Sequence, residues 1–362
     1  MQKLRIALLF GGKSAEHEIS IKSAKAIYEN LDKERYDVYP IPFTKENFCV
    51  LSLDEETQEM SFEKGYEVLE NGFIDGSERG LPPAVLSYAD IELIIPIIHG
   101  SFGEDGKLQG MLDMLEIPYL GAGVLGSAIG MDKEIQKILV KSQGIEIAPF
   151  KVFHHADWSK DQTAILSEIQ DKLSLPYFVK PANAGSSVGI SKVKSADMLE
   201  AAMNEAFLYD TKVIIEEGLS SVREIESAVI GNSEIEVAEA FSEVIPDREF
   251  YDYEAKYASD SKSQVIIPAA FTEKEHHTLK ETAKKIYRIL QCSGFARVDL
   301  FVDKEGVIYF NEINTLPGFT PISAFSKMWK ASGVSYPQLL DKLIQLALDS
   351  AEEKQRLRYS KA

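Results

Sequence analysis

The sequence predicts a chain of mixed α/β and α+β class that begins with a doubly wound parallel α/β domain. In the first third, apolar runs at 5–10, 36–43 and 92–100 alternate with helical segments near 21–31 and after Gly106. Continuous apolar runs of this kind indicate strands that are covered by helices on both faces. Because ligands usually bind beyond the carboxyl ends of such strands, the loops that follow them are candidate site segments.

The composition is that of a globular protein with a sizeable core. The 362 residues are 45% hydrophobic and 27% charged, with a net charge of −18. This acidity argues against nucleic acid or an anionic membrane as the main partner. No stretch reaches the roughly 18 apolar residues of a membrane span. With only Cys49 and Cys292 present, a reducing and therefore cytoplasmic location is expected.

Three domains are predicted along the chain. A segment rich in glycine and small residues, 118–130, marks a boundary near residue 125. The predicted units are 1–125, an α+β unit at 126–220, and a second α+β unit at 221–362. Within the last unit, the polar stretch 250–262 has the length of a lid or binding loop.

Two alternating strands in 294–314 are predicted to form a hairpin. The ladder is expected to start with Val302 opposite Val307. Because antiparallel partners keep a constant sum of residue numbers, Arg297 should then lie opposite Glu312.

The same register places Phe295 opposite Asn314, and side chains two residues apart share a face. Asp299 would therefore join Arg297, Glu312 and Asn314 on one face. Two carboxylates and an amide suit Mg²⁺ bound together with nucleotide phosphates. The guanidinium beside them could stabilise charge on a transferring phosphoryl group or an oxyanion. The alternative is an edge hairpin whose charges face water.

A loop rich in glycine and serine follows a short apolar strand that ends in a lysine. Lys180 closes the strand, and the loop from Gly185 to Gly189 contains Ser186 and Ser187. Backbone N–H groups and hydroxyls in such a loop can wrap phosphate. The spacing is not that of a GxxxxGK[ST] loop, so the pattern alone is weak evidence. Lys133 could add a second positive charge, or it could be an ordinary surface lysine.

Acidic residues follow the apolar run that precedes Gly218. The backbone from Glu216 to Leu219 could meet the edge of an adenine base, and Glu224 could accept hydrogen bonds from ribose hydroxyls. The alternative is a strand edge whose acids are solvated.

Seven segments occur along the chain in the order GGKSAEHEIS, HGSFGEDGKLQG, MDKEIQK, VKPANAGSSVG, FYDYEAKY, ARVDL and NEINTLPGFTPIS. Their order and approximate spacing resemble those of the D-alanine–D-alanine ligases of the ATP-grasp superfamily. The resemblance covers essentially the whole chain and implies an ATP-grasp fold behind the N-terminal domain. It further implies ATP-dependent joining of two D-alanines through a D-alanyl phosphate, for peptidoglycan precursor synthesis. ATP, two Mg²⁺ ions for which Mn²⁺ can substitute, and a homodimer formed through the N-terminal unit are also implied.

The resemblance assigns roles by position. The residues expected around ATP are Lys133, Lys180, Ser187, Glu216, Glu217, Leu219, Glu224 and Lys256. The expected metal ligands are Asp299, Glu312 and Asn314. The residues expected around the two D-alanines and the oxyanion are Glu16, His99, Arg297, Gly318 and Ser323. Glu16 is further expected to form a hydrogen-bonded chain with Ser186 and Tyr257. A histidine after an apolar strand, read alone, is more often structural.

Three other functions remain open from the sequence. A D-alanine–D-lactate ligase is disfavoured by Tyr257, because the depsipeptide-forming relatives carry a histidine in this lid. A non-catalytic ATP-binding regulator would bind nucleotide without D-alanine-stimulated phosphate release. A nicotinamide-dependent dehydrogenase is disfavoured because the early glycine pair lacks GxGxxG spacing. His17, where arginine is frequent in the family, and Ser101 with Phe102 depart from the family pattern. These departures bear on fine geometry and substrate affinity and not on the reaction class.

Overall fold

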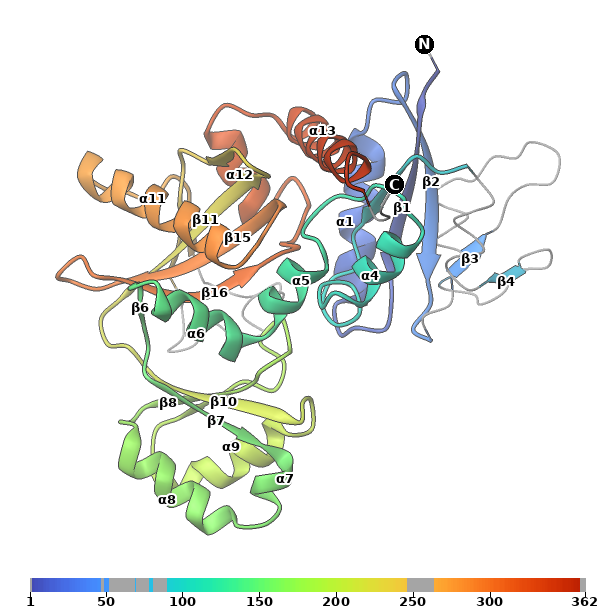
Figure 1. Cartoon of the computed structure of the whole chain (residues 1–362). Helices are drawn as coiled ribbons and strands as arrows, with labels where there is room; N and C mark the ends of the chain where they lie inside the picture. The colour runs from blue at the N-terminus through green and yellow to red at the C-terminus, as the bar shows by residue number, and fades with distance from the viewer. Residues whose placement is uncertain are drawn as a thin grey trace.

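The computed structural model describes residues 2–46, 49–51, 69, 78–80, 90–245 and 264–358. The chain forms three sheets, with the N-terminal and C-terminal sheets side by side and the central one below the C-terminal sheet in the view of Figure 1. The predicted lid stretch, with Lys256 and Tyr257, lies outside the described residues.

The N-terminal sheet has the strand order β4-β3-β2-β1-β5, and β1 pairs in parallel with both β2 and β5. Its elements are β1 (Leu4–Gly11), α1 (His17–Asn30), β2 (Tyr36–Phe43), β3 (Cys49–Leu51), β4 (Glu78–Gly80), β5 (Leu93–Pro96) and α4 (Lys107–Met114). Alternate residues of β1 enter two different apolar clusters. Ile6 and Leu8 pack with α1, whereas Ala7 and Leu9 pack with α4. Both faces are therefore covered, which confirms the doubly wound prediction.

The central sheet is antiparallel with the order β7-β10-β8-β9. Its elements are β7 (Phe150–His154), α7 (His155–Trp158), α8 (Gln162–Lys172), β8 (Tyr177–Pro181), β9 (Ser191–Val193), a short 3-10 helix (Ala196–Met198), α9 (Leu199–Ala206) and β10 (Lys212–Glu217). Val179 and Ile215 pack toward α8 and α9. Because side chains alternate, Lys180 and Glu216 point to the opposite face, toward the C-terminal sheet.

The C-terminal sheet has the order β14-β13-β11-β15-β16-β6, with β12 beside β11. Its elements are α5 (Val124–Met131), α6 (Lys133–Ser142), β6 (Glu146–Ile147), β11 (Arg223–Gly231), β12 (Ile235–Val237), β13 (Ser242–Ile245), β14 (Gln264–Ile266), α11 (Glu273–Ile289), β15 (Gly294–Val302), β16 (Ile308–Asn314), α12 (Ala324–Ala331) and α13 (Tyr336–Gln355).

One segment predicted to belong to the central unit lies elsewhere. Strand β6 pairs with β16, and Val140, Ile145 and Ile147 are buried in one cluster with Phe310 of the C-terminal sheet. Residues from 126 to about 148 thus pack on the C-terminal sheet, and the central sheet begins only at Phe150. The difference arises because an apolar pattern shows that a segment is buried but not which sheet buries it.

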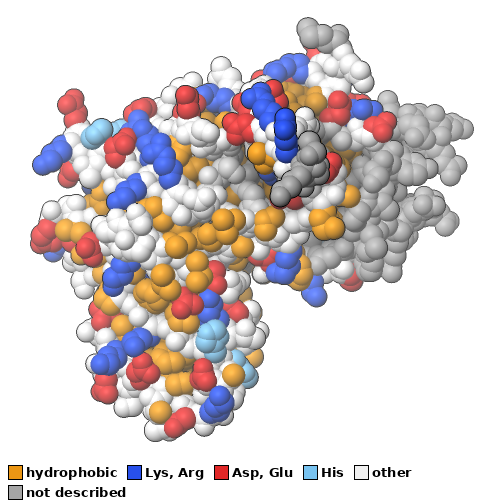
Figure 2. Space-filling view, viewed as in Figure 1, with side chains coloured by type: hydrophobic (Ala, Val, Ile, Leu, Met, Phe, Trp, Pro, Cys, Tyr) orange, Lys and Arg blue, Asp and Glu red, His pale blue; other side chains and the backbone are white. Residues whose placement is uncertain are grey.

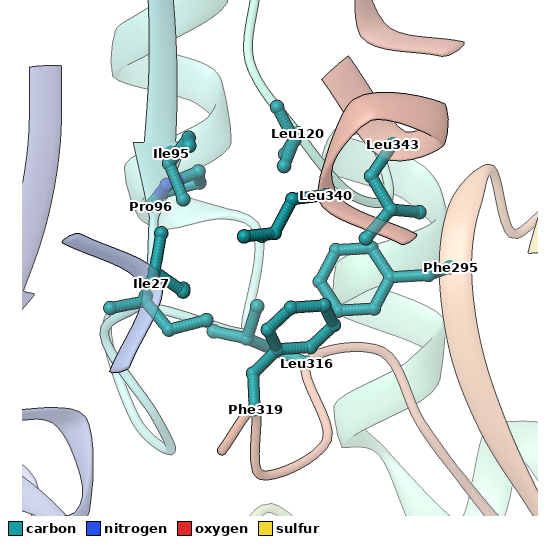
Figure 3. A pocket seen from close by; sticks show the side chains of 10 residues that line it. Ile27, Ile95, Pro96, Leu120, Phe295, Leu316, Phe319, Leu340 and Leu343 are labelled. Carbon is teal, nitrogen blue, oxygen red and sulfur yellow. The ribbon is translucent and has the colours of Figure 1, made fainter. Parts of the chain in front are cut away.

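The N-terminal and C-terminal parts share an apolar junction. Figure 3 shows Ile27 of α1 and Ile95 of β5 facing Phe295 of β15, with Leu340 of α13 between them. The gap that remains there is only about 10 Å³, and it is lined by apolar groups. A space of this size and character holds no ligand, so the junction is a packed core.

The surface carries charges of both signs. On the face in Figure 2, lysine and arginine side chains are interspersed with aspartate and glutamate. Over the described parts of the chain, no helix is both long enough and apolar enough to span a membrane.

Candidate active site

A cleft of about 740 Å³ opens where the three sheets meet. Its walls come from the loops after β1 and β5, the Gly-Ser loop after β8, the end of β10, and strands β11, β15 and β16. The predicted site residues that line it are Glu16, His99, Lys133, Lys180, Ser186, Ser187, Glu216, Glu217, Leu219, Glu224, Arg297, Asp299, Glu312, Asn314, Gly318 and Ser323. The structure therefore brings together every predicted site residue that it describes.

The predicted face of the hairpin is present, but the predicted register is wrong. Asp299 pairs with Glu312, and Arg297 pairs with Asn314. Arg297 therefore does not lie opposite Glu312, and Phe295 does not lie opposite Asn314.

Two separate one-residue shifts explain the difference. Val302 pairs with Ile308 and not with Val307, because Val307 closes the loop through a hydrogen bond from its N–H to Asp303 Oδ1 at 2.8 Å. A β-bulge then adds Asn311 to β16. One shift alone would have turned every side chain to the other face, but two shifts restore the original face.

The bulge directs Glu312 into the cleft. Leu300 pairs with Phe310, whereas Asp299 pairs with Glu312, so Asn311 is the extra residue. Phe310 points into the apolar core. In a regular strand Glu312 would point the same way, two residues further on. Bulges commonly redirect side chains next to sites in this manner.

Arg297 is held by two carboxylates. Its Nε and Nη2 donate to the two oxygens of Asp299 at 2.7 and 2.6 Å, and its Nε lies 3.2 Å from Glu226 Oε1. Burial lowers the pKa of Arg297, but Asp299 and Glu226 outweigh it, so the pKa is raised well above its usual value. Burial raises the pKa of Asp299, against the effect of Arg297. Glu226 was not predicted from the sequence, although it lies two residues after Glu224 on the same face of β11.

A chain of alternating charges connects the hairpin with the central sheet. Lys133 Nζ lies 3.4 Å from Glu312 Oε2 and donates to the carbonyl of Ala184 at 2.7 Å. Glu216 lies between two lysines, with Oε2 at 2.7 Å from Lys180 Nζ and Oε1 at 3.0 Å from Lys137 Nζ. Burial raises the pKa of Glu216, but the two lysines outweigh it and lower the pKa to about 2.

Lys137 was not singled out from the sequence. Its side chain is only 1% exposed. It lies one helical turn after Lys133 on α6, and residues four apart share a helix face, so the spacing could have revealed it.

The expected adenine side combines backbone with an apolar wall. Leu219 and Glu224 line the cleft together with Pro176 and Phe178. The side chain of Glu217 is partly engaged, since its Oε1 accepts from the N–H of Ser174 at 2.7 Å.

The N-terminal domain closes on the Gly-Ser loop through Glu16. The hydroxyl of Ser186 donates to Glu16 Oε1. A Cβ at Gly100 would lie 2.6 Å from Glu16 Oε2, and one at Gly185 would lie 3.0 Å away. Glycine is therefore required at Gly100, whose φ is also +77°. The described part of the predicted chain from Glu16 to Ser186 is present, and Tyr257 lies beyond the described residues.

His99 is a buried residue of the cleft wall. Its Nδ1 lies 3.0 Å from the carbonyl of Leu316, and its Nε2 lies 3.0 Å from Ser23 Oγ. Burial lowers its pKa, but Glu104 and Glu16 outweigh this and raise the pKa overall. His99 thus has structural contacts as well as a place on the cleft.

Ser323 and Gly318 lie close together at the start of α12. A Cβ at Gly318 would lie 3.3 Å from Ser323 Oγ, and Ser323 Oγ accepts from the N–H of Thr320 at 3.1 Å.

The donor set on the hairpin suits a hard divalent cation. Asp299, Glu312 and Asn314 offer carboxylate and amide oxygens on one face of the cleft, which is the ligand chemistry of Mg²⁺. Among the described residues, no three histidine, cysteine, aspartate or glutamate side chains gather as a metal site.

Comparison with known proteins decides the family. A family model described as D-ala D-ala ligase N-terminus matches residues 5–122, and one described as D-ala D-ala ligase C-terminus matches residues 139–345. The chain belongs to the D-ala D-ala ligase family. It is 46% identical to the D-alanine–D-alanine ligase of Caldicellulosiruptor bescii, with all of both chains covered. It is 42% identical to that of Geobacillus thermodenitrificans, with 99% of both covered.

Solved structures of D-ala D-ala ligase relatives have the same fold. The D-alanine-D-alanine ligase from Coxiella burnetii has a TM-score of 0.81 at 32% identity, covering 98% of this chain and 97% of its own. The VanG D-Ala:D-Ser ligase from Enterococcus faecalis has a TM-score of 0.81 at 35% identity, covering 96% of this chain and 100% of its own. The ATP-grasp fold expected from the sequence is confirmed. The D-ala D-ala ligases are ATP-dependent, so membership of this family implies that the chain binds ATP and a divalent metal.

The two places where this chain departs from the family pattern, His17 and Ser101 with Phe102, are accommodated locally. His17 is buried, with its Nδ1 2.7 Å from the carbonyl of Gly12. Phe102 lies beneath two cations, with Lys107 Nζ 5.1 Å from its ring centre and Lys13 Nζ at 6.0 Å. Neither feature removes a predicted site residue from the cleft.

Proposed function

We propose that this chain joins two D-alanine molecules to D-alanyl-D-alanine, using ATP, for peptidoglycan precursor synthesis. The observation that supports this most strongly is the convergence of the hairpin acids, Arg297 and the phosphate-type loop on one cleft that Glu16 closes from the other side. Full-length relatives named as D-alanine–D-alanine ligases support the choice of substrate.

The ATP side of the cleft follows from charge and shape. Lys133, Lys180 and the N–H groups around Ser187 would bind the phosphates, with Lys256 added from the lid. The apolar wall with Glu216, Glu217 and Leu219 would hold adenine, and Glu224 would accept from ribose. Asp299, Glu312 and Asn314 would hold two Mg²⁺ ions, or Mn²⁺ in their place. These ions would supply neutralising charge for the phosphates.

The first D-alanine would be oriented from the N-terminal domain. Glu16 would bind its ammonium group, and His99 would lie near its carboxylate. That carboxylate attacks the γ-phosphorus of ATP, the bond to the β-phosphate oxygen breaks, and ADP leaves with the electron pair. The product is a D-alanyl phosphate. Arg297 would stabilise negative charge along this path.

The second D-alanine would be oriented by Ser323 through its carboxylate. Its neutral amine attacks the acyl carbon of the phosphate, and the tetrahedral oxyanion would accept hydrogen bonds from Arg297 and from the Gly318 N–H. Inorganic phosphate then leaves with the electrons of the broken C–O bond and takes up the proton that the attacking nitrogen loses. Tyr257, with Glu16 and Ser186, would help keep water out, because an exposed acyl phosphate hydrolyses.

The identity of the second substrate is tested by competition. Inorganic phosphate release is measured, and the ligation product is identified by mass spectrometry, with ATP and Mg²⁺ in the presence of D-alanine alone, L-alanine alone, or D-alanine with either D-lactate or D-serine. We expect D-alanine to suffice and D-alanyl-D-alanine to dominate in every mixture. The D-serine arm is included because a D-Ala:D-Ser ligase shares the fold. A predominant depsipeptide or serine-ended dipeptide would overturn the acceptor assignment, and nucleotide binding without D-alanine-stimulated phosphate release would indicate a regulator.

We further propose a cytoplasmic homodimer of three-domain chains, in which the N-terminal unit ends near residue 125, the central unit ends near residue 220, and residues 126–148 pack on the C-terminal sheet. Dimer formation through the N-terminal unit is supported by an exposed apolar side chain on α4, since Met114 is 88% exposed. The free, buried Cys292 suits a reducing compartment. Sedimentation of the intact protein is compared with that of Met114→Glu. A monomeric variant is expected, and an unchanged mass would overturn a contact through α4.

A further inference from the structure

The bulge that directs Glu312 into the cleft lies at an incomplete sheet edge. Strand β6 pairs with Tyr309 and Phe310 only. From Asn311 onward, the outer edge of β16 has no strand beside it in the described structure. Backbone groups at such an edge need other partners when they are buried.

Helix α6 supplies those partners from two consecutive residues. Lys137 Nζ donates to the carbonyl oxygen of Asn311 at 3.0 Å. Gln136 Oε1 accepts from the N–H of Ile313 at 3.2 Å, and its amide donates to the carbonyl of Gly130 at 2.5 Å. Both side chains are 1% exposed. The two residues therefore hold the backbone on either side of Glu312.

The helix itself is fixed at its start. Asp132 caps α6 by accepting from the N–H groups of Glu134 and Ile135 at 3.1 and 3.2 Å. Asp132 also contacts Lys212 of β10 at 2.5 Å. The anchor that reaches the bulge is thus attached to a capped helix and not to a loop.

We propose that Lys137, assisted by Gln136, is a positioning residue that holds the Asn311 bulge and thereby aims Glu312 at the metal. This inference rests on the proposed metal role of Glu312 and deepens it. Without the anchor, the strand can relax toward a regular ladder, in which position 312 faces the apolar core. Groups that orient a metal ligand in this way commonly change metal affinity by roughly 10- to 100-fold when removed.

Charge alone predicts the opposite result, which makes the test decisive. Removing a lysine near the carboxylates should strengthen the binding of a divalent cation if only electrostatic attraction matters. Removing the anchor of the bulge should weaken it. The sign of the change separates positioning from simple charge.

The experiment measures Mn²⁺ binding by electron paramagnetic resonance in the presence of a non-hydrolysable ATP analogue. For Lys137→Met we expect at least roughly tenfold weaker Mn²⁺ binding than in the unmodified protein. Lys141→Met, at an exposed position on the same helix, is the matched control and should leave binding unchanged. Equal or tighter binding in Lys137→Met would overturn the proposal.

A second pair of variants removes the effect of an unpaired buried charge. Lys137→Met leaves Glu216 with one lysine fewer and can impair folding, whereas Lys137→Met with Glu216→Gln has lost both charges. Comparing this double variant with Glu216→Gln alone tests the contact to Asn311 in a background where no Glu216 carboxylate is left unpaired. We expect weaker Mn²⁺ binding in the double variant, and identical binding in the two would refute the anchoring role.

The two proposals fail in different ways. If the unmodified protein binds no Mn²⁺ with the nucleotide analogue, the proposed ligase chemistry fails. If it binds Mn²⁺ and Lys137→Met binds it equally well, only the role of Lys137 fails. Thermal unfolding measured on the same samples shows whether a loss of binding reflects a loss of fold.

Discussion

The side chains of β15 that point toward α11 are apolar, whereas Arg297 and Asp299 on its other face enter the cleft as a charged pair. Val298 and Leu300 are buried with Ile286 of α11 in one cluster. The polar face is equally ordered, but by ion pairs with Asp299 and Glu226. Strand alternation thus places a stable core directly beneath the reacting groups, where it can hold them without touching substrate.

The largest expected effect comes from the charged face. Glu312→Gln keeps the size of the side chain but removes a negative metal ligand. D-alanine-dependent phosphate release should fall on the order of 10³-fold, because several kcal/mol of charge stabilisation are lost. The melting temperature should change little, since Glu312 is partly exposed.

The control for this prediction lies on the same hairpin. Glu305 is exposed in the loop between β15 and β16, so Glu305→Gln removes the same charge outside the cleft. Full activity is expected. A comparable loss in both variants would mean that overall charge, and not the ligand position, controls the rate.

A substitution on the apolar face should lower stability and leave activity unchanged, which is the opposite of the effect expected for Glu312→Gln. Ile286 is fully buried, and Ile286→Ala should lower the free energy of unfolding by about 2–5 kcal/mol. Phosphate release per folded molecule should remain unchanged, because no atom of the cleft is removed. Urea unfolding followed by circular dichroism measures the first quantity, and an activity loss at full folding would contradict the separation of the two faces.

A smaller effect is expected where the N-terminal domain meets the Gly-Ser loop. Ser186→Ala removes the hydroxyl that donates to Glu16. Hydrogen bonds to charged groups contribute about 1.5–3 kcal/mol, so the D-alanine concentration for half-maximal phosphate release should rise roughly tenfold or more. An unchanged value would show that the loop and Glu16 close independently.

The pH dependence of stability gives the finest comparison. The pKa of Glu216 is lowered to about 2 by Lys137 and Lys180 against burial, whereas an unfolded glutamate titrates near about 4.3. Its stabilising contribution is therefore present above the unfolded pKa and is lost as the pH falls toward the folded one. Glu216→Gln should lose stability less steeply over this acid range. The free energy of unfolding is measured with urea at several pH values. If it falls equally steeply with decreasing pH in both proteins, Glu216 is not held ionised by its lysines.

Much of this arrangement could be predicted because it depends on local patterns. Strand alternation placed Asp299 and Glu312 on one face even though the register was off by two, since an even shift preserves the face. The bulge at Asn311 could not be predicted, because it depends on side chains of α6 that are distant in sequence. The same holds for the assignment of residues 126–148, whose apolar pattern suits either sheet. Glu226 and Lys137 could have been predicted from spacing. Glu226 lies two residues after Glu224 on a strand, and Lys137 lies four residues after Lys133 on a helix.

The central step of the proposed reaction is the transfer of a phosphoryl group from ATP to the carboxylate of D-alanine. D-alanine carrying ¹⁸O in its carboxylate, incubated with ATP and Mg²⁺, tests this directly by mass spectrometry of the released phosphate. If a D-alanyl phosphate forms, one carboxylate oxygen passes to phosphate for each dipeptide made, so the phosphate carries ¹⁸O. Phosphate without ¹⁸O, released alongside dipeptide, would contradict the proposed chemistry of the cleft.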